Sequence, residues 1–200
     1  MDYLFSHFTL LEALGALLGV FQVLLSRANK VSNYLFGIAG ILIGLYIYYH
    51  ARLYADILLN LYYLVMSVYG WFFWKFGNKS HQAPISKTST KELYKALGIA
   101  LICFCGLTYW LSHHTDSDVV IWDALVSAFA WSGMWLMAKR KIENWIFLSL
   151  SNCIAIPLLL YKELYWYTGL TLFLLIVGIS GYFNWKALHL KNLEDGSTNP

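Results

Sequence analysis

Charged residues are scarce in this chain. They make up 12% of its 200 residues, whereas soluble domains carry about a quarter. The mean hydropathy is +0.55, and 59% of the residues are hydrophobic. This composition excludes an ordinary soluble domain and predicts an all-α integral membrane protein. The formal net charge is only +3, and the basic residues lie between apolar runs, so we expect no nucleic-acid partner.

Catalytic and cofactor motifs are also absent from the sequence. It has no Ser-His-Asp set, no His-Glu-x-x-His motif, no phosphate-binding glycine loop and no ion-coordinating cluster. The three cysteines, Cys103, Cys105 and Cys153, lie in apolar runs, where small helix residues are commoner than metal or redox sites. We therefore expect no enzyme, no catalytic residue, no metal, no cofactor and no ATP-driven step. A membrane-embedded enzyme and a structural or signalling subunit stay open as other classes.

Apolar runs, in contrast, fill most of the chain. A helix needs about 20 apolar residues to cross a bilayer, and the runs predict seven transmembrane helices. Their expected ranges are 8–26, 34–51, 54–76, 94–112, 119–138, 144–161 and 165–188. The linkers are short except for residues 77–93, and residues 189–200 form a polar tail that we expect to be flexible.

The Lys and Arg residues predict the orientation of these spans. Twelve of the 14 fall on one side, in alternate linkers and the tail, and only Arg52 and Lys162 fall on the other. Basic loops stay in the cytoplasm. The N-terminus is therefore expected outside and the C-terminus in the cytoplasm.

The second half of the sequence repeats the first at a constant offset. Lys141 lies 111 residues after Lys30, and the same shift holds over more than sixty positions without a gap. The matched pairs include Asn33/Asn144, Tyr34/Trp145, Phe36/Phe147, Gly70/Gly181, Trp74/Trp185 and Glu12/Asp123. We interpret this pattern as an internal duplication.

The duplication predicts an architecture. The first three spans repeat as the last three, and the single span between them restores the direction of the second triplet. The repeats are then parallel in a 3+1+3 order, as in full-length SWEET transporters, with substrate near the midplane at the repeat interface. The expected divisions are a first repeat with its cytoplasmic linker (1–93), a linker helix with an extracellular loop (94–118), a second repeat (119–188) and a cytoplasmic tail (189–200).

Polar residues inside predicted spans are costly and mark possible functional sites. Trp145 precedes Asn152 by seven residues, so both lie on one helical face, and Ser149 shares that face. An indole, an amide and a hydroxyl on one stripe suit a flat heteroaromatic ligand. Asn60 adds a second amide in another span. Glu143, at the start of its span, is interpreted as ordinary complementation of the helix dipole.

Further site residues come from aromatic and acidic positions. Trp131 and Tyr63 fall near mid-bilayer, where an aromatic ring could attract an organic cation. Packing and interfacial belts explain most other aromatic residues. Glu12 and Asp123 match across the repeats, and they are interpreted equally well as functional acids or as solvated interfacial carboxylates.

The sequence resembles the PnuC-type vitamin transporters over nearly its full length. The matching pieces are Glu12 with Gly15, Ser32-Asn33-Tyr34 with Phe36-Gly37, Leu53-Tyr54-Ala55, Tyr69-Gly70-Trp71 with Trp74, Trp122-Asp123, and Glu143-Asn144-Trp145 with Asn152. The resemblance implies a SWEET-like homotrimer in a bacterial inner membrane. It also implies uptake of a flat cationic vitamin, nicotinamide riboside by default, by facilitated diffusion, with phosphorylation by a cytoplasmic kinase as the trap.

Two positions depart from the family pattern. The family motif Trp-x-x-Trp-x-x-x-Asn has Leu148 in place of its second Trp, and Asn60 stands where the family often has Gln. The resemblance extends to a branch of the family with altered motifs, PnuT, which carries thiamine. Thiamine therefore stays open as an alternative substrate of the same fold.

Overall fold

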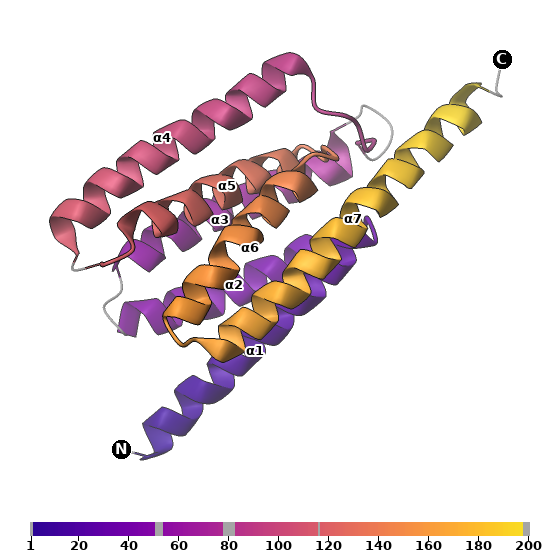
Figure 1. Cartoon of the computed structure of the whole chain (residues 1–200). Coiled ribbons are helices and arrows are strands. Elements are labelled where there is room, and N and C mark those ends of the chain that lie inside the picture. The colour runs from indigo at the N-terminus through magenta and orange to yellow at the C-terminus, as the bar shows by residue number, and fades with distance from the viewer. Residues whose placement is uncertain (1, 51–53, 78–82, 116, 198–200) are drawn as a thin grey trace. The chain divides into compact units, whose positions relative to one another are not determined.

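The computed structural model describes residues 2–50, 54–77, 83–115 and 117–197. Within them the chain forms seven helices, as the sequence predicts (Figure 1). They are α1 (Asp2–Arg27), α2 (Asn33–His50), α3 (Tyr54–Phe76), α4 (Thr90–His114), α5 (Val120–Ala138), α6 (Asn144–Tyr161) and α7 (Tyr165–Ser197). Among the described residues, five helices are long and apolar enough to cross a membrane: α1, α4, α5, α6 and α7. The predicted all-α membrane protein is confirmed.

Three helices extend well beyond their expected ranges, and the first of them, α1, begins at Asp2 rather than at residue 8. α4 begins at Thr90 rather than 94, because Ser89 and Glu92 form a capping box: the Glu92 N–H donates to Ser89 Oγ, and the Ser89 N–H donates to the Glu92 carboxylate (3.0 Å). α7 continues to Ser197. Residues 189–197 of the expected flexible tail are therefore helical. Residues 198–200, together with Arg52 and Lys79 of the charge count, lie outside the described residues.

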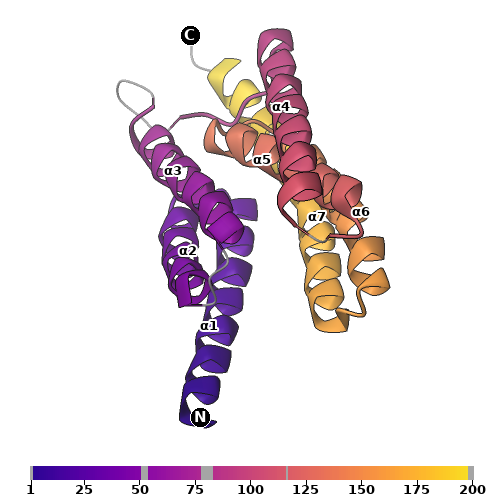
Figure 2. The ribbon, with the colours of Figure 1, turned by 90° about the vertical axis from the view of Figure 1, so that its left-hand side faces the viewer.

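The chain divides into two compact units, Met1–Ala83 (unit 1) and Pro84–Pro200 (unit 2). In unit 1, α2 packs on both α1 and α3 (Figure 2). In unit 2, α6 packs on both α5 and α7, and α4 covers α5 (Figure 1). The same order of packing therefore recurs in each unit, with the middle helix of each triplet between the other two. The boundary between the units lies inside the predicted linker 77–93.

The backbone repeats with the offset found in the sequence. α2 and α6 each have 18 residues, and their first residues are 111 positions apart. The turns before them also match, because Asn29 has φ 58° and Arg140 has φ 57°. The N–H groups of Lys30 and Lys141 then each donate to the carbonyl five residues earlier, at 2.9 and 3.0 Å. Each turn is thus closed by one residue of left-handed conformation after a helix end.

Candidate functional site

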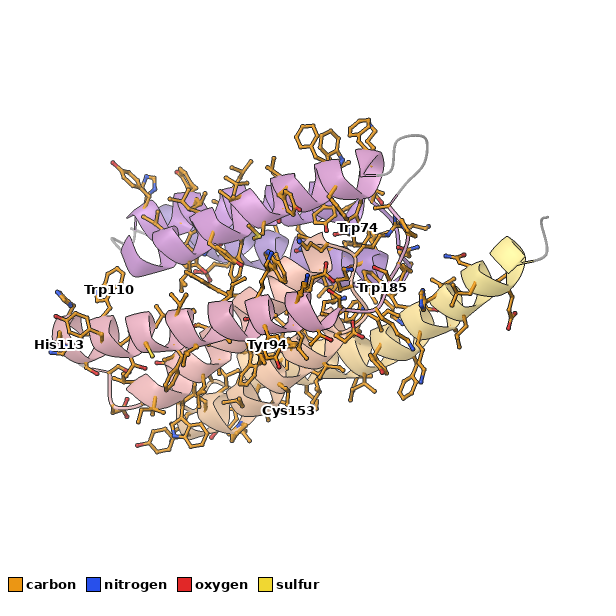
Figure 3. The ribbon with its side chains drawn as sticks, turned by 90° about the horizontal axis from the view of Figure 1, so that it is seen from above. Trp74, Tyr94, Trp110, His113, Cys153 and Trp185 are labelled. Carbon is orange, nitrogen blue, oxygen red and sulfur yellow. The ribbon has the colours of Figure 1, made fainter. Side chains whose placement is uncertain are left out.

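Trp145, in the first turn of α6, packs against α7. Its side chain is only 1% exposed. Its ring meets Trp185 of α7 edge-on, with ring centroids 5.6 Å apart and planes at 89°, which is a favoured aromatic geometry. A Cβ added at Gly181 would lie 2.7 Å from this ring, closer than any side chain could approach. We call Trp145, Gly181 and Trp185 the α6–α7 lock; Figure 3 labels Trp185 among the side chains.

Unit 1 contains the matching arrangement. Tyr34 of α2 is 1% exposed and meets Trp74 of α3 edge-on at 5.2 Å and 87°; Trp74 is labelled in Figure 3. Gly70 leaves the space that the Tyr34 ring occupies. The two locks follow the same offset of 111 residues, so the duplication extends to the packing of side chains.

A buried amide precedes the aromatic ring in each unit. The Asn144 Nδ2 donates to the Lys141 carbonyl at 2.5 Å, and the Asn33 Nδ2 donates to the Lys30 carbonyl at 2.7 Å. Both asparagine side chains are buried. These bonds satisfy carbonyls in the turn and fix the first residue of α6 and of α2. Sequence comparison found the pair as a match but did not assign it this role.

Asn152 lies on the α6 face between the two neighbouring helices. Leu148 marks the α5 side, because a Cβ added at Gly133 of α5 would lie 2.7 Å from Leu148 Cδ2. Trp145 marks the α7 side. Asn152 follows Leu148 by four residues and Trp145 by seven, so it points between these two directions. Its side chain is half-buried.

A hollow of about 320 Å³ lies on the other flank of the contact between α6 and α7. Trp145, Ser149 and Cys153 line it from α6, together with Ile146 and Leu150, and α7 adds Leu175, Ile179, Tyr182 and Phe183. Ser149 Oγ would lie 2.8 Å from a Cβ at Gly178. This lining is mainly apolar, whereas a cationic vitamin needs several convergent polar groups. We therefore do not assign the vitamin to this hollow.

The other predicted ligand residues lie on α1, α3 and α5. Asn60 of α3 faces α2, with its Oδ1 3.5 Å from the position of a Cβ at Gly44. Tyr63 of α3 meets Tyr62 edge-on at 5.9 Å. Trp131 is half-buried on α5. Asn60 and Tyr63 lie in unit 1, whereas Asn152 lies in unit 2. The roles of Asn60, Tyr63 and Trp131 as ligand residues stay predictions.

The matched acids differ in their surroundings. Glu12 is exposed on α1, whereas Asp123 is half-buried in the first turn of α5 and accepts a hydrogen bond from Ser117 Oγ at 3.4 Å. Just outside the span, Lys162 forms an ion pair with Asp118. The Lys162 ammonium donates a hydrogen bond to the Asp118 carboxylate. This bond lowers the pKa of Asp118 and raises the pKa of Lys162. Both side chains of this pair are exposed, and the pair lies at the opposite end of α6 from the α6–α7 lock.

Comparison with known proteins identifies the family. The family described as "Nicotinamide mononucleotide transporter" matches residues 9–187. The chain belongs to this family.

Proteins similar to this chain include nicotinamide riboside transporters named PnuC. That of Escherichia coli (strain K12) is 22% identical over 202 residues, covering 88% of this chain and 84% of the relative. That of Neisseria mucosa is 26% identical over 206 residues, covering 93% and 75%. The crystal structure of the vitamin B3 transporter PnuC superposes with a TM-score of 0.70 at 21% identity, covering 95% of this chain and 86% of that one.

These comparisons decide between the classes left open by the sequence. The resemblance to PnuC-type transporters is confirmed, and so is the prediction of a transporter rather than an enzyme. The family and the five apolar helices also support a multi-pass protein of a bacterial inner membrane.

Proposed function

We propose that this chain takes up nicotinamide riboside, or a vitamin of similar shape and charge, by facilitated diffusion. The observation that carries the proposal is the position of Asn152 on α6. Asn152 lies between Leu148, which packs against Gly133 of α5, and the α6–α7 lock. The chain belongs to a family of transporters. An amide at that place can both donate to and accept from the polar edge of a vitamin ring. The names of the relatives support the substrate class.

The remaining parts of the proposal come from the sequence and the resemblance. The twelve-to-two distribution of Lys and Arg supports an N-terminus outside and a C-terminus in the cytoplasm. The repeated helix order supports the parallel, SWEET-like 3+1+3 arrangement. The homotrimer and the trapping of substrate by a cytoplasmic kinase follow from the resemblance alone. Asn60, Tyr63, Trp131, Ser149, Glu12 and Asp123 stay proposed ligand residues.

Thiamine is the second substrate that we propose to test. Leu148 and Asn60 depart from the family pattern, and both nicotinamide riboside and thiamine are flat, cationic and able to form hydrogen bonds. Because Leu148 packs against Gly133 of α5, its effect on selection would pass through the spacing of α5 and α6.

Uptake into proteoliposomes tests the mechanism. With substrate outside and no ion gradient, we expect uptake to run until the two concentrations are equal, because the sequence holds no nucleotide motif and no ion-coordinating cluster. Radiolabelled nicotinamide riboside and thiamine are measured in parallel, and empty liposomes are the control. Accumulation above the outside concentration that requires a proton or sodium gradient would contradict the proposal.

A further inference from the structure

The segment Pro84–Ser89, which we call the strap, is bound along the turn between α5 and α6. Ser86 and Lys141 form a parallel bridge: the Ser86 N–H donates to the Arg140 carbonyl at 3.2 Å, and the Ile142 N–H donates to the Ser86 carbonyl at 3.1 Å. The Ile85 and Ile142 side chains are buried beside it. The strap is therefore a fixed part of unit 2 rather than a free linker; it precedes α4 in Figure 1.

Side chains hold the strap on both sides of this bridge. The Glu143 carboxylate accepts from the Thr88 N–H at 2.7 Å and from the Thr88 hydroxyl at 2.5 Å. The Lys141 ammonium lies 2.9 Å from the Glu92 carboxylate and 3.4 Å from the Lys87 carbonyl. Hydrogen bonds to ionised groups are stronger than neutral ones, so Glu143 and Lys141 provide the firmest attachments.

The strap also contacts α7. Nδ1 of His189 donates to the Ile85 carbonyl at 2.9 Å. His189 follows Trp185 by four residues and Gly181 by eight, so these three residues share one face of α7. The strap is thus hydrogen-bonded both to the start of α6 and to the face of α7 that carries Gly181 and Trp185.

Glu143 is not needed to begin the helix. The duplication places Ser32 at the matching position of unit 1, and α2 begins at the same point as α6 without a carboxylate there. The α6 N-terminus likewise has no side-chain capping bond. Helix-dipole complementation, which the sequence suggested for Glu143, therefore does not account for the direction of its carboxylate toward Thr88.

We propose that Glu143, Thr88 and His189 are positioning residues that set the spacing of α6 and α7 through the strap. The strap holds the first turn of α6 beside α7. The contacts of Trp145 with Gly181 and Trp185 then fix the distance between the two helices, and this distance sets the position of Asn152 further along α6. The expected effect on transport rests on the proposed function, whereas the expected effect on the spacing of α6 and α7 does not.

The test compares Glu143→Ala with Glu143→Gln, whose amide oxygen can still accept a bond from Thr88. The control is Ser32→Ala at the matching position of unit 1. Hydrogen exchange by mass spectrometry on the full chain follows residues 140–147 and 181–189, with 29–36 as an internal reference. Proteoliposome uptake of nicotinamide riboside gives KM and the maximal rate separately.

Glu143→Ala loses both charge-assisted hydrogen bonds from Thr88. We therefore expect about tenfold faster exchange in 140–147 and 181–189, and about a tenfold higher KM. Exchange in 29–36 should not change. Glu143→Gln should restore most of both effects, and Ser32→Ala should match the parent. If Glu143→Ala is poorly folded, Thr88→Val is used instead, because it removes only the hydroxyl bond to Glu143. We expect the same two changes in exchange and KM, but smaller.

Parent-like exchange in a folded Glu143→Ala protein would contradict the claim that Glu143 holds α6 and α7 through the strap. Faster exchange with an unchanged KM would overturn its positioning role. If the exchange pattern holds but the parent takes up neither vitamin, the proposed function fails while the effect of the strap on α6 and α7 stands.

Discussion

Gly181→Ala should unfold at a clearly lower temperature than the parent and should lose most of its uptake. The new Cβ would lie 2.7–2.9 Å from three ring atoms of Trp145. That ring cannot retreat, because it is 1% exposed and packed edge-on against Trp185. Overpacking of this kind costs about 1–3 kcal/mol. The intrinsic helix preference of Ala over Gly returns at most about 1 kcal/mol, so the clash decides the sign.

The matched control lies on the same helix. A Cβ at Gly169 would meet no atom within 4 Å, so Gly169→Ala should be neutral or slightly stabilising. Thermal unfolding in detergent and proteoliposome uptake are measured for both variants. Equal stability of Gly181→Ala and Gly169→Ala would show that the α6–α7 lock is not close-packed. Gly70→Ala should be destabilising in the same way, since it meets the Tyr34 ring in unit 1.

Trp145→Ala should cost about 3–5 kcal/mol of stability, as is typical when a large buried aromatic side chain is removed, and should abolish uptake. Trp145→Tyr is the informative partner variant. Tyr34 occupies the matching position of unit 1 with the same edge-on contact to a tryptophan, so a tyrosine at 145 should keep most of the stability. If the Trp145 indole stacks on the flat heteroaromatic ligand that its stripe suits, the Tyr variant should also bind a cationic vitamin more weakly, because Trp is the better cation–π partner.

Unfolding in detergent and ligand binding separate these two effects. A Tyr variant as unstable as the Ala variant would contradict the equivalence of the two locks. A Tyr variant with parent-like stability and parent-like affinity would confine Trp145 to packing. In the present conformation Gly181 and Trp185 cover its ring, so stacking on a ligand stays a prediction.

The helices could be predicted from the sequence because long apolar runs in a membrane protein admit few other structures. α6 was predicted at 144–161 and found at Asn144–Tyr161. The start of α4 was missed because the Ser89-x-x-Glu92 capping box lies in a polar linker, where hydropathy gives no signal. The helical course of residues 189–197 was missed for the same reason.

The side-chain contacts could be predicted from the sequence only in part. The offset paired Gly70 with Gly181 and Trp74 with Trp185, and those matches were a usable signal for the two locks. The bond from Thr88 to Glu143 joins residues 55 positions apart, and no local pattern indicates it. Leu148 was noted only as a departure from the family motif. Its contact with Gly133 depends on how α5 and α6 cross, which a single helix pattern does not encode.

Binding of nicotinamide riboside and thiamine to purified parent protein and to Asn152→Ala tests the central claim most directly. Calorimetry gives the affinities, and thermal unfolding without ligand confirms that the half-buried amide can be removed without loss of the fold. We predict that Asn152→Ala weakens the preferred vitamin by about 1–3 kcal/mol, the cost of an unmatched buried polar group, or roughly 5- to 150-fold in affinity. Unchanged affinity for both vitamins in a folded Asn152→Ala protein would contradict the account and place the site on another face.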